Sequence, residues 1–215
     1  MIDSRRQSSQ TALATDVWWL WMDAIGGYRL MQGDQFTIGG PCGDDMADIA
    51  VRSSWRRRMA LLSRLGDDFW LTTTAAAGST PQPPIARRVS FDTCLPIDPA
   101  NVSSQASQPD LRLHKPSPLS GTVLVTVEPP HRFVLPFDAM LLVDKTILIG
   151  SECTAHIRAT QCSEPGIVLA KRTDGWWLHR GCGTAQRLLE GERTEVADLA
   201  MTIRRETAVS VGEKR

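Results

Sequence analysis

Hydrophobic and polar residues alternate in short runs along most of the chain, and turn-forming residues separate these runs. Examples are "QFTIG" (35–39), "TVLVTV" (122–127) and "GIVLAKR" (166–172), with Gly, Pro, Asp or Asn close to their ends. Short alternating or β-branched runs are typical of β-strands, whereas a helix would repeat its apolar positions every three or four residues. The pattern therefore predicts an all-β chain without long helices.

The predicted strands are spread over both halves of the chain. In the first half they are 17–23, 28–32, 35–39, 48–51, 59–65, 68–73, 89–95 and 110–115. In the second half they are 122–127, 132–135, 140–144, 146–150, 156–159, 166–172, 175–180, 186–191 and 199–206. Gly-Asp and Asp-Gly pairs between runs favour hairpin turns. Two stretches rich in small, polar and Pro residues, 72–86 and 96–110, predict long loops.

The second half repeats the order of features in the first half. Ile38-Gly39 matches Ile149-Gly150, and "MALLSRLGDDFWL" (59–71) matches "GIVLAKRTDGWWL" (166–178) without a gap. A repeat of this length is the size of a small domain and is longer than an ordinary solenoid unit. We therefore expect two β domains, 16–115 and 118–208, joined by a short stiff Pro-containing linker, "HKPSPLSG". Residues 1–15 are expected to be a disordered tail, and 209–215 a second tail.

The ordered features of each half resemble those of the forkhead-associated (FHA) domain, a β-sandwich that binds phosphothreonine peptides. The resemblance rests on a strand ending in Ile-Gly, the segment "ADIAV", the segment "RRRMALLSRL" and the turn with aromatic strand "GDDFWL". It covers about 16–115, and more faintly 118–208, where "LLEGERTEV" is similar to the closing hairpin of the family. It implies a tandem pair of FHA-like β-sandwiches acting in signalling or as a scaffold.

The residues that read phosphothreonine in the family are missing at the matching positions. Gly40 and Ser151 stand where the family has an Arg after Ile-Gly, and Arg56 and Met59 replace the Ser and His of a Ser-Arg-x-His segment. Arg57 keeps the Arg of that segment. An Asn-Gly pair is absent after each aromatic strand, where "TTTAAAGSTPQPP" and "GCGTAQ" stand instead. The resemblance thus predicts the family's fold with a lost phosphothreonine pocket and a protein partner bound in another way.

The basic segment "SSWRRRM" (53–59) is the strongest candidate for a ligand site. A phosphate needs charge-assisted donors in fixed positions, and Ser53, Ser54, Arg56, Arg57 and Arg58 offer such donors. One alternative is therefore an active phosphopeptide reader that uses Arg56–Arg58. The other interpretation, which we favour, is that these arginines only face water on an edge strand. Trp55, next to them, would be a contact anchor for a partner if it were exposed.

A second candidate site is a zinc-stabilised second domain. Its ligands would be Cys153, His156, Cys162, His179 and Cys182, which the inferred sandwich places on three loops at one tip. Their spacing matches no standard zinc site. His156 also stands where the first half has Asp48, and this favours an ordinary residue at the start of a strand.

Composition excludes several other classes of function. The chain has 24 basic and 24 acidic residues and a formal net charge of zero, so neither a nucleic acid nor a membrane is expected as a partner. Five cysteines at wide spacings favour a reducing, cytoplasmic location. Local catalytic motifs are absent, so we expect no enzyme and no cofactor. Of the pairs Trp18–Trp19 and Trp176–Trp177, one member each should be buried, because successive strand residues point to opposite faces.

Overall fold

The structure is a computed structural model that describes residues 16–41, 46–73, 86–97, 108–164, 166–181, 183 and 185–206. These residues form strands, turns and irregular segments without any helix, so the all-β prediction is confirmed. The segments expected to be tails, 1–15 and 209–215, lie outside the described residues. Most residues of the two stretches expected to be loops, 72–86 and 96–110, also lie outside the described residues.

Seventeen strands are present in the described residues. The first half contributes β1 (Asp16–Met22), β2 (Gly26–Gln32), β3 (Gln35–Gly39), β4 (Ile49–Ala50), β5 (Ala60–Leu65), β6 (Asp68–Thr73), β7 (Ala86–Arg88) and β8 (Leu111–His114). The second half contributes β9 (Val123–Val127), β10 (Ala139–Val143), β11 (Thr146–Gly150), β12 (Ile157–Arg158), β13 (Ile167–Arg172), β14 (Gly175–Arg180), β15 (Gln186–Leu188), β16 (Arg193–Val196) and β17 (Leu199–Arg205).

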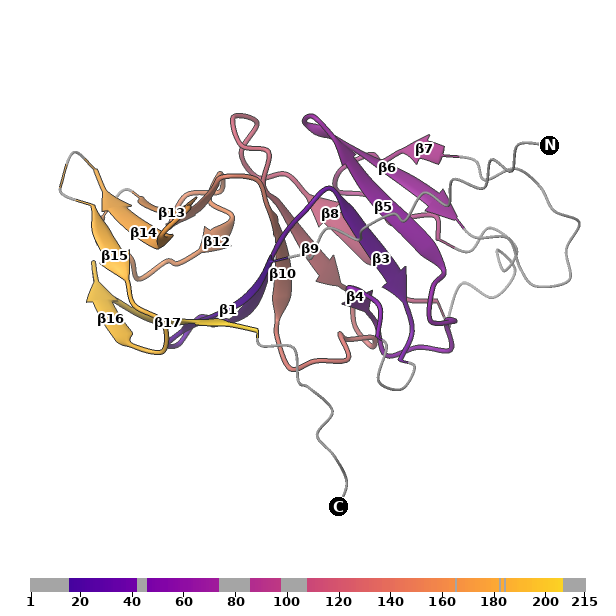
Figure 1. The fold of residues 1–215 in the computed structure, drawn as a ribbon, viewed down its shortest axis with the longest axis horizontal. Helices are drawn as coiled ribbons and strands as arrows, with labels where there is room; N and C mark the ends of the chain where they lie inside the picture. The colour runs from indigo at the N-terminus through magenta and orange to yellow at the C-terminus, as the bar shows by residue number, and fades with distance from the viewer. Residues whose placement is uncertain are drawn as a thin grey trace, which may run out of the picture.

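The strands form three sheets, and two of these are copies of each other in order. One five-stranded sheet has the order β4-β3-β5-β6-β7 and the other the equivalent order β12-β11-β13-β14-β15. The third sheet has seven strands in the order β16-β17-β1-β2-β10-β9-β8. Figure 1 shows the two five-stranded sheets on the right and on the left, with the seven-stranded sheet running between them. The repeat found in the sequence is thus a structural repeat of the five-stranded sheets.

The seven-stranded sheet carries a hydrophobic core on each face. Leu30 of β2 belongs to the core that includes β11–β15, whereas its neighbour Met31 belongs to the core that includes β3–β7. On β10, Leu141 and Leu142 divide between the two cores in the same way. Because successive residues of a strand point to opposite faces, the two five-stranded sheets cover opposite faces of the shared sheet.

The two sandwiches do not correspond to separate halves of the chain. In the first sandwich β3–β7 pack over β8, β9 and β10, whereas in the second β11–β15 pack over β16, β17 and β1. The expected boundary between 115 and 118 therefore falls between β8 and β9, which are neighbours in one sheet. The structure differs here from a tandem pair of self-contained domains, because strands of each half complete the sandwich of the other.

Three local predictions differ from the structure. Residues 89–95 form a turn with a single bridge at Cys94, and the strand lies just before them, at β7. Residues 132–135 contribute only the isolated bridge between Phe133 and Val51. The alternation of residues did not predict strand β16, although the resemblance to the FHA family placed its residues in a closing hairpin. Both β7 and β16 are mostly exposed, so they lack the alternation of buried residues from which the other strands were predicted.

The alternation predicted for the tryptophan pairs is confirmed. Trp18 and Trp176 are 9% and 1% exposed, and they meet edge to face inside the second sandwich with ring centroids 6.4 Å apart. Trp19 and Trp177 point to the other faces of their sheets and are half-buried. Trp19 stacks on the exposed Trp21, with centroids 5.2 Å apart. The Trp-rich strand β1 therefore anchors one core and leaves an aromatic pair on the opposite face.

Candidate functional site

The basic segment 53–59 crosses over the end of strand β3. The backbone N–H of Gly40 donates to the carbonyl of Arg56 at 2.8 Å, and that of Met59 donates to the carbonyl of Ile38 at 2.8 Å. On the other side, the N–H of Val51 donates to the carbonyl of Gly39 at 2.9 Å. The segment is held by backbone contacts against the Ile-Gly end of the strand.

This crossing requires glycine at two successive positions. A Cβ at Gly39 would lie 1.9 Å from the carbonyl oxygen of Arg57, and a Cβ at Gly40 would lie 2.1 Å from that of Trp55. Real Cβ atoms essentially never approach backbone so closely. The resemblance to the FHA family places Gly40 where that family carries an Arg that contacts phosphate. Backbone of the crossing segment occupies the space that such a side chain would need.

Trp55 and Ser53 serve the local structure of the crossing segment. Trp55 is only 9% exposed and packs in the first core, so it is not the exposed contact anchor considered above. Ser53 Oγ accepts the N–H of Trp55 at 3.3 Å and donates to the carbonyl of Val51, also at 3.3 Å. Ser53 therefore closes a turn, whereas Ser54 next to it is exposed.

The arginines of the segment differ in exposure and gain neighbours from the second half. Arg56 and Arg58 are exposed, and Arg57 is half-buried. The N–H of Arg52 donates to the carbonyl of Arg132 at 2.8 Å, so two further exposed arginines lie at the base of the segment. The sequence did not indicate Arg132, because the two segments are 80 positions apart and are joined by backbone contacts around the bridge between Val51 and Phe133.

The five residues of the zinc hypothesis have different environments. Cys153 is exposed, whereas Cys162 is buried with its Sγ 3.4 Å from the carbonyl of Glu164. His179 Nε2 lies 3.0 Å from the guanidinium of Arg172. Within the described part of the chain, no group of three or more His, Cys, Asp or Glu side chains is placed to hold a metal ion. Cys182 lies outside that part.

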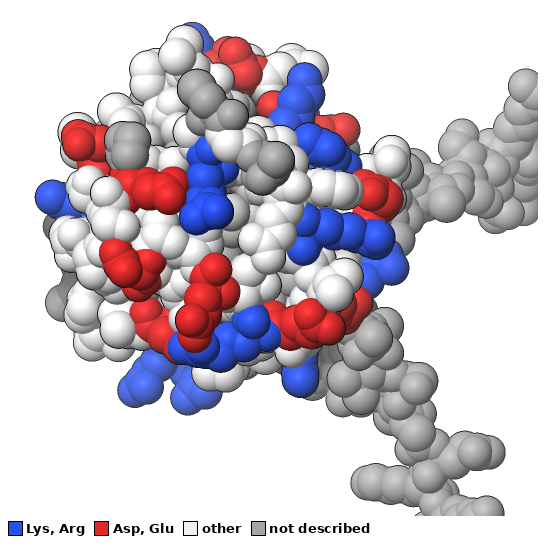
Figure 2. Space-filling model, turned by 90° about the vertical axis from the view of Figure 1, so that its left-hand side faces the viewer, with Lys and Arg blue, Asp and Glu red and all other residues white. Residues whose placement is uncertain are grey.

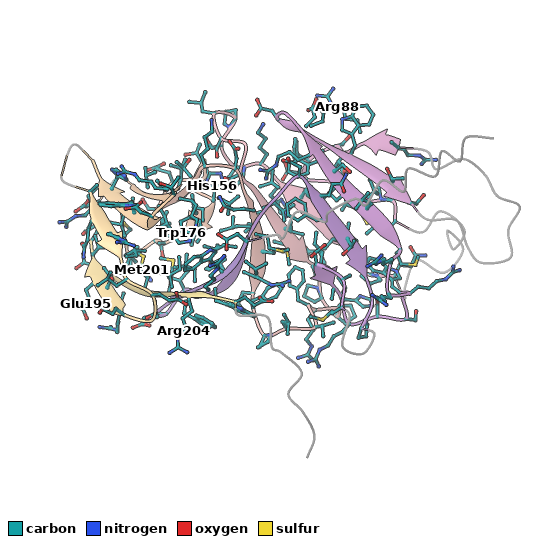
Figure 3. All side chains as sticks on the ribbon, viewed as in Figure 1. Arg88, His156, Trp176, Glu195, Met201 and Arg204 are labelled. Carbon is teal, nitrogen blue, oxygen red and sulfur yellow. The ribbon has the colours of Figure 1, made fainter. Side chains whose placement is uncertain are left out.

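His156 is a buried structural acceptor. It is 2% exposed, and its Nδ1 accepts the N–H of Leu148 at 2.9 Å. At the equivalent place in the first half, Asp48 Oδ2 accepts both the N–H and the hydroxyl of Thr37, at 2.8 and 2.7 Å. Figure 3 shows His156 and Trp176 inside the second sandwich. Burial lowers the pKa of His156, opposed by the backbone of Thr122, so the neutral ring is favoured.

A carboxylate, an imidazole and a hydroxyl are hydrogen-bonded in series on the first sandwich, and the sequence did not reveal this array. His114 Nδ1 lies 2.7 Å from Asp92 Oδ1, and its Nε2 lies 2.9 Å from Thr126 Oγ1. The N–H of Asp92 also donates to the carbonyl of Leu113 at 2.8 Å. The array has the order of groups found in catalytic triads. Here it fastens the turn at 91–94 onto β8 and β9.

A shallow cavity of about 190 Å³ lies beside β7, away from both predicted sites. Leu71, Arg87, Arg88, Val89, Ser90, Thr93, Cys94, Leu95 and Pro96 line it. Burial raises the pKa of the Cys94 thiol, and Asp110 raises it further. Since the thiolate is the nucleophilic form, Cys94 is a poor nucleophile at neutral pH.

No family model, no curated protein and no solved structure matches this chain. Within the described residues, nothing forms a helix with the length and apolar character that a membrane crossing requires.

Proposed function

We propose that this protein is a non-catalytic protein-interaction scaffold with FHA-like sandwiches, in which the phosphothreonine pocket has been lost. The observation that carries this proposal is the crossing at Gly40. The backbone carbonyl of Trp55 takes the space that an Arg side chain at this position would need. A change of that one residue therefore could not restore the pocket without moving the crossing segment.

Several other observations support a binding role for the protein. Figure 2 views the molecule from the left-hand side of Figure 1, and acidic and basic side chains are interspersed over the described part of that face. In the described residues, ion pairs such as Arg193–Asp23 at 2.9 Å join exposed side chains of opposite charge. A mixed-charge surface suits a protein partner better than a nucleic acid, which needs a continuous basic footprint. The cysteines that the structure describes are free, which fits the proposed cytoplasmic location.

The first test is binding to a degenerate phosphothreonine peptide library, with the unphosphorylated library beside it at two salt concentrations. We expect equal retention of both libraries. Selective, salt-sensitive retention of the phosphorylated peptides would refute the loss of the pocket.

A second candidate function is the binding of phosphopeptides through the arginine segment. Arg56 and Arg58 are exposed, and the exposed Arg52 and Arg132 lie at the base of the same segment. If this function holds, the double variant Arg56→Ala/Arg58→Ala abolishes selective retention of phosphorylated peptides. The matched control is Arg87→Ala, which removes an exposed arginine of β7 and should leave the retention unchanged.

A zinc-stabilised second domain stays a third, separate prediction. It requires Cys182 and a rearrangement of the other four residues. Metal analysis of protein purified without chelator tests it, since less than one equivalent of zinc removes the hypothesis.

A further inference from the structure

The first hairpin of each half, β1–β2 or β9–β10, forms part of the sandwich of the other half. The hairpin β1–β2 belongs to the first half, but β1 pairs with β17 along Trp18–Met22, and its buried side chains lie in the second core. The hairpin β9–β10 belongs to the second half, but β9 pairs with β8 and its buried side chains lie in the first core. The exchange is reciprocal, since each five-stranded sheet covers a hairpin from the other half.

The two exchanged hairpins meet along the middle of the shared sheet. Strand β2 pairs with β10 in parallel, from Tyr28 opposite Ala139 to Gln32 opposite Val143. Residues 28 and 139 are 111 positions apart, which is also the separation of Ile38 and Ile149 in the repeat. The seam therefore joins equivalent strands of the two halves. Both are buried on both faces along most of this seam, and β10 is buried throughout.

Equivalent basic residues fix the exchanged hairpins from the five-stranded sheets. Arg64 of β5 donates to the carbonyls of Leu142 and Val143 at 2.7 and 3.1 Å. Its counterpart in the repeat is Lys171 of β13, whose Nζ lies 3.1 Å from Asp16 and 4.5 Å from the ring centre of Trp18. Each contact reaches across from one half to the hairpin of the other. Arg64 and Lys171, the equivalent basic residues of the two repeats, thus each bind the hairpin contributed by the other half.

We propose that each half is an obligate partner of the other, so that the chain is a covalently linked, hairpin-exchanged pair. Without its partner, the first half would lose β9 as the neighbour of β8, and the second half would keep only β16 beside β17. Each five-stranded sheet would also lose the hairpin that covers part of its buried face. Pairing these strand edges and covering this apolar surface both favour association with the other half, which supplies the matching strands. The partner that fits this surface is therefore another copy of the repeat.

The experiment uses the full chain with a specific protease site inserted between Pro118 and Leu119, where Leu119 is 98% exposed. After cleavage, we expect a stable one-to-one complex of the two fragments. Its thermal unfolding should be a single transition whose midpoint rises with protein concentration, because dissociation and unfolding occur together. The uncut insertion protein should unfold at a midpoint that does not depend on concentration.

Two outcomes would overturn the proposal. One is separation of the cut halves into folded monomers, and the other is dissociation followed by two unfolding transitions independent of concentration. Arg64→Met tests the anchoring contact and should weaken association of the cut halves about tenfold to a hundredfold, since two hydrogen bonds from a charged group are lost. Arg88→Met is the control, because Arg88 pairs with Asp68 of its own sheet. An equal effect of both variants would contradict the anchoring role.

Discussion

At equivalent positions of the two halves, Asp48 and His156 each accept a hydrogen bond from the N–H of the neighbouring strand. Asp48 does so with a carboxylate that also receives the hydroxyl of Thr37, whereas His156 uses Nδ1 of a buried ring. The imidazole therefore has a structural task that consumes one of its two nitrogens. This task is incompatible with the use of Nδ1 as a metal ligand.

His156→Ala should reduce the free energy of unfolding by about 1–3 kcal/mol, because it leaves the N–H of Leu148 without its side-chain acceptor. His156→Asn should lose less, since the amide oxygen can accept the same hydrogen bond. Equilibrium denaturation of the parent and both variants measures the difference. Equal losses in the two variants would show that the acceptor contributes nothing.

The stability of the parent should also depend on pH through His156. Its pKa is lowered in the folded state, so the unfolded chain binds the proton more readily. Stability from this group is complete above the ordinary pKa of 6.5 and falls as the pH drops below it. The parent should therefore lose stability relative to His156→Asn between pH 7 and pH 5. Parallel pH profiles of the two proteins would refute this prediction.

The close contact of the crossing segment with Gly40 predicts that Gly40 and Gly166 differ in their tolerance of a side chain. Gly40→Ala should cost about 3 kcal/mol, because the new Cβ meets backbone at 2.1 Å. Gly166→Ala is the matched control, since its Cβ would have its nearest neighbour at 4.0 Å. Thermal unfolding of both variants measures the contrast, and a stable Gly40→Ala would mean that the crossing segment moves easily. The sequence identified Gly40 as a departure from the FHA pattern that the chain resembles, but only the structure shows what fills the space.

At the scale of elements, most strands could be predicted because one face of each strand is buried. Strands β3, β5 and β13 show this alternation, and their sequences were assigned correctly. The exposed strands β7 and β16 have no such signal, so nothing in their pattern separates them from loops. The short segment at Phe133 forms a single bridge and depends on a contact with Val51 from the other half.

Lys171 joins strand β13 to strand β1, and its replacement should lower the stability of the second sandwich. The loss of its contacts with Asp16 and the ring of Trp18 should cost about 1–3 kcal/mol at neutral pH. Burial raises the pKa of Asp16, but the nearby indole N–H of Trp18 and the positive charges of Lys171 and Arg205 outweigh this and lower it. Stability from this lowered pKa exists above about pH 4 and is lost in acid as Asp16 binds a proton.

The variants Lys171→Met and Arg172→Met test this coupling by denaturation at pH 7 and pH 3. The difference between Lys171→Met and the parent should shrink at the lower pH. Arg172 is exposed and lies over Trp177 on the outer face, so its replacement should cost less at both values. A pH-independent loss in Lys171→Met would exclude the ion pair as its cause.

At the scale of the whole molecule, the exchange of hairpins could not be predicted from the sequence. Strand β10 is apolar along its whole length, and β1 carries apolar residues at successive positions, so the pattern does not select one sandwich for either hairpin. The two-residue connections to the next strands, 33–34 and 144–145, are equal in length and also give no direction. The structure shows that the chain leaves β2 toward one face of the shared sheet and leaves β10 toward the opposite face. The direction in which the chain leaves β2 and β10 therefore determines which core each hairpin joins, and this direction is visible only in the structure.

The exchange predicts that a core mutation acts on the distant half of the chain. Leu20 and Val125 are both fully buried, but Leu20 lies in the second core and Val125 in the first. Leu20→Ala and Val125→Ala should each cost about 2–4 kcal/mol through the loss of buried apolar atoms. Amide hydrogen exchange can locate these losses. Leu20→Ala should accelerate exchange most in β13 and β14, and Val125→Ala most in β5 and β6. Self-contained domains would give the reverse assignment, with each mutation opening the strands of its own half.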